Sequence, residues 1–317
     1  MITTSTDPGD DPEKQLPLSA QGVLNFYKDN AANIFPPAKI PIMETIRQFF
    51  CGAKYNPQTL DKLLVEYCGE RTLSGALTNV IIPSFDIKLQ QPVFFSSWKT
   101  SFKDVLVRDV CRATTAAPTF LPPVEFDAPT GAENNRRTFN MIDGGIAANN
   151  PSVLWYLTQL DMSLLFPQND FEKLLVLSLG TGRHRTGYSA EDAKKWGVIK
   201  WLRHNGDTPL ISSLQNASAD MVDYNLSMIF DAHGFRKNYL RIQTNISPEL
   251  SKLDDSKNLE KLMCIGVKLL TEQNVFKFTS KTWEIVTTRT PEKIKDELDR
   301  FAMRLSNLRK MRPPIIL

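Results

Sequence analysis

The stretch that most constrains the fold is a continuous apolar run followed at once by two glycines. Residues 174–179 read Leu-Leu-Val-Leu-Ser-Leu, and Gly180-Thr181-Gly182 follows them. A run of this length, closed by turn residues, is typical of a strand buried on both faces, as in a parallel sheet covered by helices. Strand-like and helix-like segments alternate along the rest of the chain, which favours a layered α/β class.

The remaining elements are predicted from periodicity and from capping residues. Ser19 is a good N-cap for a first helix that ends before Pro36-Pro37, with Val23, Phe26 and Tyr27 on its apolar face. Further helices are expected around residues 60–67 and over 152–160, 209–230, 258–271 and 291–309. Strands are expected over residues 79–87, 92–95, 138–142 and 239–243.

Composition narrows the class of protein without defining it. The 317 residues are 42% hydrophobic and 23% charged, which is ordinary for a globular protein with a full core. The net charge of +3 is too small to argue for nucleic acid, and no basic block is interleaved with aromatics, so we expect no nucleic-acid partner. The chain begins with polar residues and has no signal peptide or transmembrane run, which indicates a cytoplasmic or peripheral membrane location.

The cysteines and histidines give no pattern of a metal or disulfide site. The four cysteines are widely scattered, so free thiols in a reducing compartment are favoured over disulfides. The three histidines are dispersed without ligand spacing, so no metal and no other cofactor is expected.

One segment carries the elements of a catalytic loop. Thr138–Ile142 is the predicted strand, Asp143 stands at its carboxyl end, and Gly144-Gly145 follow where the backbone must turn sharply or approach another group closely. Asn150 is then a good N-cap and Pro151 a good first helical residue. In open α/β sheets such strand ends form the ligand crevice, so Asp143 can act as a general base if a hydroxyl lies within reach. The alternative is that Asp143 only caps a turn, because Asp-Gly is a common turn dipeptide.

The segment from Asp143 to Pro151 resembles the Asp-Gly-Gly/Ala motif of the patatin-like lipid acyl hydrolases. The resemblance extends, in order, from about Met1 to Arg312. It includes Cys111–Pro122 with its Ala-Pro-Thr sequence, Ser178–Gly182, and Ile81–Asp86. It also includes Tyr27–Asn30, Ile34–Pro36, and Arg300–Ala302 with Leu305-Ser306. It implies a three-layer α/β/α domain with a mainly parallel central sheet. It further implies hydrolysis of acyl lipids, such as phospholipids or galactolipids, at a transient membrane surface.

The resemblance also assigns the catalytic parts. In that family a Ser–Asp dyad acts: a serine on a Gly-x-Ser-x-Gly elbow attacks the ester, an aspartate accepts its proton, and a glycine-rich loop binds the oxyanion. By resemblance Asp143 is the proton acceptor, and Asp143, Gly144 and Gly145 form the motif. No Gly-x-Ser-x-Gly occurs in the 317 residues, and the only adjacent glycines are Gly144-Gly145. The nearest candidate, Ser189, is followed by Glu191 where the second glycine belongs and is interpreted as a surface serine.

Because Met1–Thr4 resembles the end of the helix after the elbow, we expect a chain that lacks the first strands, the oxyanion loop and the nucleophile. Such a chain is expected to be inactive alone and to expose unpaired strand edges. The alternative is a non-catalytic patatin-like protein that binds lipid or a partner, or serves in storage. A third interpretation, in which another serine serves as the nucleophile, is also open.

We expect a single domain over residues 1–317. In it, residues 1–18 form a polar loop, 19–190 the partial catalytic core with the Asp-Gly-Gly motif, and 191–317 a helical C-terminal part. The last helix carries an apolar stripe of Ile294, Leu298, Phe301, Leu305 and Leu308 among basic residues. Packing of this stripe onto the domain is favoured over a membrane-surface helix.

Overall fold

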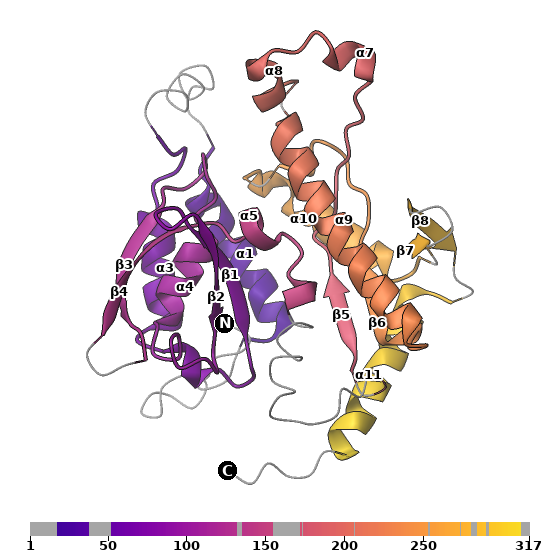
Figure 1. Ribbon diagram of the computed structural model, residues 1–317, viewed down its shortest axis with the longest axis horizontal. Coiled ribbons are helices and arrows are strands. Elements are labelled where there is room, and N and C mark those ends of the chain that lie inside the picture. Colours follow the sequence, from indigo (N-terminus) through magenta and orange to yellow (C-terminus); the bar gives the residue numbers. More distant parts are fainter. Residues whose placement is uncertain are drawn as a thin grey trace. The chain divides into compact units, whose positions relative to one another are not determined.

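The computed structural model describes residues 18–37, 52–131, 135–154, 172, 174–205, 207–252, 254–272, 274–279, 284–289 and 292–311 (Figure 1). The predicted N-terminal loop (all but residue 18), Cys51 and residues 155–160 of one predicted helix lie outside this set. The chain divides into two compact units, of which unit 1 comprises residues 1–149 with 254–256, and unit 2 comprises 150–253 with 257–317. The single-domain arrangement predicted above stays a prediction.

Unit 1 is a four-stranded sheet packed against helices. The helices are α1 (Ala20–Ile34), α3 (Gln58–Cys68), α4 (Val107–Thr114) and α5 (Gly145–Ala148), with a 3₁₀ turn η2 (Leu73–Gly75). The strands are β1 (Ile81–Asp86), β2 (Gln91–Ser96), β3 (Val124–Pro129) and β4 (Arg136–Ile142). They lie in the order β2-β1-β4-β3, and every neighbouring pair is antiparallel.

The antiparallel direction differs from the mainly parallel sheet that the resemblance implies. Residues 87–90 join β1 to β2, and residues 130–135 join β3 to β4. Connections this short allow only antiparallel pairing, because parallel neighbours need a crossover of a dozen or more residues. Among the described residues, one strand pair, in unit 2, is parallel.

The core of unit 1 lies between the sheet and the helices α3 and α4. Phe95 from β2 and Phe139 from β4 are fully buried, and their ring centroids are 5.5 Å apart. Leu64 from α3 and Val110 from α4 pack into the same cluster. At the start of the unit, Ser19 caps α1 by accepting a hydrogen bond from Gly22 N at 3.1 Å, as predicted, although Tyr27 is exposed rather than on the packed face.

Unit 2 is built around two parallel strands, β5 (Val176–Leu179) and β6 (Tyr239–Ile242). Its helices are α7 (Ala190–Ala193), α8 (Val198–Leu202), α9 (Pro209–Ala232), α10 (Leu259–Leu269) and α11 (Ile294–Met311). Short 3₁₀ turns η3 (Arg236–Asn238) and η4 (Ser256–Asn258) and a hairpin of β7 (Asn274–Thr279) and β8 (Glu284–Arg289) complete the described elements. None of the described helices is both long enough and apolar enough to cross a lipid bilayer.

Helix α9 packs on one face of the β5–β6 pair, and α11 packs on the β6 half of the other face. Val176 of β5 packs with Leu226 and Phe230 of α9. On the other face a second cluster joins β6 to α11, and it consists of Leu240, Ile242, Ile294 and Phe301, with Leu298 beside it. The apolar stripe of the last helix therefore packs onto the domain over its first half, as predicted, whereas Leu305 is exposed.

The prediction that residues 174–179 form a strand buried on both faces is wrong for one face. Val176 and Ser178 are buried, but Leu177 is 41% and Leu179 66% exposed. In the parallel register Leu177 lies beside Leu240, and Leu179 beside Ile242. The cluster with α11 holds the two β6 side chains but neither β5 leucine, which leaves that face of β5 uncovered among the described residues.

Candidate functional site

Asp143 follows the last residue of β4, as the sequence predicts. Phe139 and Met141 of this strand are fully buried in the core of unit 1, so the register of β4 is fixed by packing. The strand ends at Ile142, and the four-residue helix α5 begins two residues after Asp143, at Gly145. Packing of β4 thereby places the carboxylate at the carboxyl end of a rigid strand.

Backbone groups of two neighbouring segments hold the Asp143 loop. Asp143 N donates to Ala116 O at 3.0 Å, and Gly144 N donates to Thr114 O at 3.4 Å. Thr114, the last residue of α4, also donates from Oγ1 to Pro83 O of β1 at 2.7 Å. The segment with the Ala-Pro-Thr sequence thus supplies the acceptors that position the loop.

Close approach to backbone, rather than an unusual backbone angle, requires a glycine at position 144, and a side chain at position 145 would crowd the Asp143 carboxylate. A Cβ atom on Gly144 would lie 2.1 Å from Pro83 O, closer than any real contact. A Cβ atom on Gly145 would lie 2.8 Å from Asp143 Oδ1. Gly144 therefore lets the loop pass against β1, and Gly145 lets the carboxylate fold back over the start of α5.

The Asp143 carboxylate is partly buried and has few partners. Oδ1 accepts a hydrogen bond from Gly145 N at 2.5 Å. Burial raises the pKa of the Asp143 carboxyl, and the hydrogen bond from Gly145 N only partly offsets this. A carboxylate with a raised pKa is a better proton acceptor than a solvated one, so the arrangement suits a general base.

No serine hydroxyl in the described part of the chain hydrogen-bonds to this carboxylate. Ser84, which is buried in the neighbouring strand β1, donates instead to Ile142 O at 2.7 Å. Ser189 is exposed and caps α7, where it accepts from Asp192 N at 3.0 Å, in agreement with its interpretation as a surface serine.

The raised pKa of Asp143 leads to a prediction about stability. A group whose pKa is higher in the folded than in the unfolded chain contributes stability at low pH and loses it as pH rises through the folded pKa. We therefore expect the free energy of unfolding of Asp143→Asn to equal that of the wild type near pH 3 and to exceed it toward neutral pH. This direction is unusual, because most substitutions destabilise a protein by about 0.5–3 kcal/mol. Urea unfolding at several pH values measures this, with Asp104→Asn at an exposed position as the control. A variant that is less stable than the wild type at pH 7 would contradict it.

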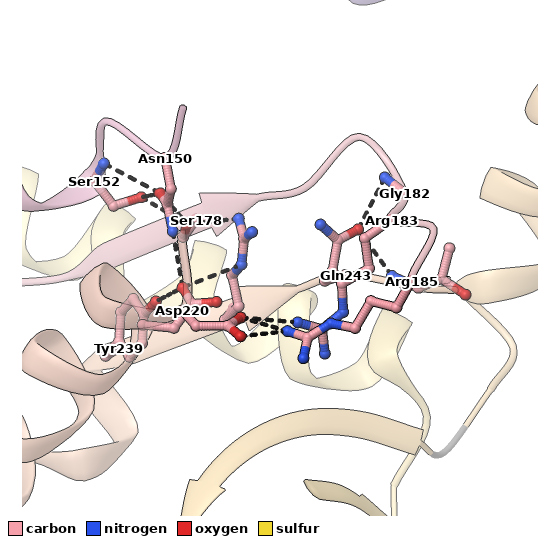
Figure 2. A network of polar contacts seen from close by, with 12 residues as sticks. Asn150, Ser152, Ser178, Gly182, Arg183, Arg185, Asp220, Tyr239 and Gln243 are labelled. Carbon is pink, nitrogen blue, oxygen red and sulfur yellow. Dashed lines mark hydrogen bonds and ion pairs between the residues drawn. The ribbon is translucent and has the colours of Figure 1, made fainter. Parts of the chain in front are cut away.

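A second polar cluster, in unit 2, surrounds the residues that follow the motif (Figure 2). Asn150 Oδ1 accepts from Ser152 N at 3.3 Å, as expected of an N-cap, and from Ser152 Oγ at 2.7 Å. Ser152 Oγ is in turn 2.6 Å from Ser178 Oγ of β5. Asn150 Nδ2 donates to Asp223 Oδ1 of α9 at 2.8 Å. These bonds tie the segment after the motif to β5 and α9.

Asp223 is the centre of this cluster. Besides Asn150, Tyr239 OH donates to its Oδ1 at 2.9 Å, and Arg241 Nε lies 3.3 Å away as an ion pair. Burial raises the pKa of the Asp223 carboxyl despite the opposing effect of Arg241 and of the two hydrogen bonds. Arg241 Nη1 also donates to Ser178 Oγ at 3.0 Å. Arg241 Nε pairs with Asp223 as a charge but makes no hydrogen bond, whereas the other polar groups named here have partners within the cluster, which is the pattern of a structural network.

Gly180 and Gly182, which follow β5, are also explained by local structure. Gly182 N donates to Gln243 Oε1 at 2.8 Å, a contact visible in Figure 2, and Gly182 has a φ of +86°, which favours glycine. A Cβ atom on Gly180 would lie 2.4 Å from the Gln243 side chain. Arg183 and Arg185 both pair with Asp220 of α9, at 3.2 Å and 2.5 Å. The chain thus leaves β5 along a path fixed by β6 and α9.

Of the residues predicted for the site, the structure brings Asp143, Gly144 and Gly145 together in unit 1. The sequence did not predict that the carbonyl groups of Thr114 and Ala116 accept hydrogen bonds from the loop, because every residue type has a backbone carbonyl. It also missed Asp223, although an acidic residue on the buried face of a helix is a detectable sign of a buried pair.

Comparison with known proteins shows which family the chain resembles. Residues 9–152 match the family model described as patatin-like phospholipase. The chain is 36% identical to "Patatin-like protein 2" of rice (Oryza sativa subsp. indica), over 95% of this chain and 78% of that protein. It is 35% identical to "Patatin-like protein 1" of Arabidopsis thaliana, over 93% of this chain and 75% of that protein. It is 34% identical to "Probable inactive patatin-3-Kuras 1" of potato (Solanum tuberosum), over 98% of this chain and 79% of that protein.

The family match and these relatives define the class of protein: an α/β protein of a family whose broad function is lipid acyl hydrolysis. The chain belongs to the patatin-like phospholipase family.

Proposed function

We propose that this chain carries the proton-accepting half of a patatin-like lipid acyl hydrolase site, with Asp143 as the base of a Ser–Asp dyad. The observation that supports this most directly is the position of Asp143: a partly buried carboxylate with a raised pKa at a rigid strand end, held by backbone bonds and followed by Gly144, where a side chain would collide with the backbone of β1. In the proposed reaction a serine Oγ attacks the ester carbonyl carbon while its proton passes to Asp143. Collapse of the tetrahedral intermediate then breaks the ester C–O bond, and the alcohol leaves with the proton from Asp143. Water attacks the resulting acyl-enzyme, gives a proton to Asp143 and releases the fatty acid, and that proton returns to the serine. The substrates would be phospholipids or galactolipids at a membrane surface.

We further propose that the 317-residue sequence does not perform this reaction by itself. It contains no Gly-x-Ser-x-Gly, and Gly144-Gly145 are its only adjacent glycines. Loss of a single oxyanion donor costs about 10²–10³ in rate, and loss of a nucleophile costs more.

An esterase assay on the purified chain tests this second proposal. With p-nitrophenyl acyl esters and with phosphatidylcholine, the wild type and Asp143→Ala are expected to show the same background turnover. Turnover by the wild type that disappears in Asp143→Ala would overturn the proposal of inactivity.

A chimera tests the role of Asp143. The N-terminal segment of a patatin-like relative, including its Gly-x-Ser-x-Gly motif, is fused ahead of this chain. The chimera is expected to hydrolyse acyl esters, and Asp143→Asn to lower its kcat by about 10²–10⁴. The exposed Asp104→Asn is the matched control and should leave kcat unchanged. An active chimera that tolerates Asp143→Asn would refute the assignment of the base.

A second candidate function is a non-catalytic patatin-like protein that binds lipid, binds a partner or serves in storage. The observation that favours it is the similarity to a potato protein named as probably inactive, together with the missing serine motif. An inactive chimera with a native circular dichroism spectrum and a cooperative unfolding transition would support this candidate.

A further inference from the structure

The segment between β5 and α9 presents apolar side chains to solvent. Val198 and Ile199 of α8 are 74% and 77% exposed, and Trp201 and Leu202 of the same turn are also exposed. At the start of α9 the exposed apolar residues continue with Leu210, Ile211 and Leu214. We call the four α8 residues together with these three the α8 surface. Single exposed apolar residues are common, but a group of them on two helices that contact each other is the kind of surface that binds a partner.

The exposure of the α8 surface is not a sign of a loose loop, because the inner side of the segment is well packed. The Trp196 ring lies 4.8 Å from the Tyr188 ring and 4.5 Å from the His204 ring, so one aromatic cluster joins residues on both sides of α8. Asp207 accepts hydrogen bonds from Tyr188 OH at 2.9 Å and from Ser212 Oγ of α9 at 2.8 Å. The apolar side chains are therefore presented on an ordered scaffold.

The charges around the α8 surface indicate the kind of partner. Residues 194–203 contain four basic residues and no acidic one, and the acidic residues nearest before them, Glu191 and Asp192, lie in α7. Lys194, Lys195 and Lys200 among them are exposed. Lysine is depleted from protein–protein interfaces, whereas lysine together with tryptophan and aliphatic residues is typical of segments that lie in the interface of an anionic membrane.

The length and position of α8 also fit an anionic membrane as the partner. The helix α8 has five residues, too few to span a bilayer, and Figure 1 shows α7 and α8 at the end of unit 2 where α9 begins. Val198, Ile199 and Leu202 share one face of its single turn, so they can enter the acyl region together while the lysines reach headgroups.

We propose that the α8 surface is a docking site for an anionic lipid surface: Val198, Ile199 and Leu202 insert into the interface, Trp201 lies beside them with its ring 5.3 Å from that of Trp196, and Lys194, Lys195 and Lys200 contact the headgroups. This inference deepens the proposed function, because it names the surface by which the chain meets its lipid. It concerns binding alone and needs no activity at Asp143.

Vesicle flotation with the full 317-residue chain tests the proposal. The wild type is expected to float with vesicles of phosphatidylcholine and phosphatidylglycerol and to bind phosphatidylcholine alone weakly. The double variant Val198→Ser, Ile199→Ser is expected to lose on the order of tenfold or more in partition to the mixed vesicles. The triple variant Lys194→Gln, Lys195→Gln, Lys200→Gln should lose on the order of 10²-fold and should no longer respond to salt.

The matched control changes two apolar residues of unit 2 that are also more than half exposed, on other helices. Val267→Ser in α10 with Leu305→Ser in α11 should leave vesicle binding unchanged. All variants are at exposed positions, and thermal unfolding confirms that each is folded.

Three outcomes would overturn the proposal. The first is a wild type that does not float with the mixed vesicles, and the second is equal binding by the serine variant of α8. The third is a concentration-dependent oligomer, seen by light scattering, that the α8 variant dissociates while vesicle binding is absent. That result would assign the α8 surface to a second copy of the chain. None of these outcomes depends on the esterase assays, so failure of the docking site and failure of the Asp143 assignment are distinguishable.

Discussion

Replacing Asp223 with alanine is expected to lower the free energy of unfolding by about 3–5 kcal/mol, because it leaves the buried Arg241 guanidinium without its counter-charge. The Asp223 and Arg241 side chains are only 12% and 9% exposed, so water cannot replace the lost partner. Asn150 Nδ2 and Tyr239 OH would lose their acceptor at the same time. Urea unfolding followed by circular dichroism measures the effect.

Asp220→Ala is the matched control, since Asp220 lies one helical turn earlier on α9 and also pairs with arginines, but at a more exposed position. We expect it to cost about 1 kcal/mol or less. The complementary variant, Arg241→Met, leaves the Asp223 carboxylate without its counter-charge. Acidification should restore part of the free energy of unfolding that this variant loses, because the carboxyl can then take up a proton. Equal stability of Asp223→Ala and Asp220→Ala would show that the buried cluster contributes nothing beyond a surface pair.

The second large effect is expected at Gly144. Gly144→Ala should destabilise unit 1 by about 1–3 kcal/mol, because the new Cβ meets the backbone of β1 and neither strand can move without disturbing the sheet. Gly75→Ala is the control, since a Cβ atom there meets nothing within 4 Å. It should change stability by no more than about 0.5 kcal/mol.

Hydrogen–deuterium exchange shows where in unit 1 the Gly144→Ala substitution lowers local stability. The amides of Asp143 and Gly144, which donate to Ala116 O and Thr114 O, should exchange faster in the variant, whereas those of β2 should not. Unchanged exchange at these two amides, together with unchanged stability, would mean that the loop accommodates a side chain and that the close approach to Pro83 O is not a constraint.

The local elements could be predicted from sequence because their causes are local. Ser19 is a side-chain cap three residues from its donor, and the helix over 209–230 has a proline at its first position and no breaker inside. The same holds for the strand over 138–142, in which the buried Phe139 and Met141 alternate with the less buried Thr138 and Asn140. Asp143 at the end of this strand followed from the same pattern.

Features that depend on pairing between distant segments could not be predicted in this way. The antiparallel order β2-β1-β4-β3 depends on which strands meet, and residue composition does not encode that. The apolar run over 174–179 has the composition of a strand covered on both faces, yet whether Leu177 and Leu179 are covered depends on what packs beside β5. The Asp223 cluster joins Asn150, Ser178 and Tyr239, which are far apart in sequence and have unremarkable neighbours.

The way in which the Asp143 loop is fastened bears on how such a chain changes over evolutionary time. Its two anchoring bonds run from main-chain amides to main-chain carbonyls, so replacing the side chain of Ala116 with another small one breaks neither. A gene of this kind can therefore accumulate many substitutions around the loop and still fold the aspartate into the same place. Because backbone hydrogen bonds fix the conformation of this loop, the conformation can be retained even in a protein that no longer catalyses the reaction.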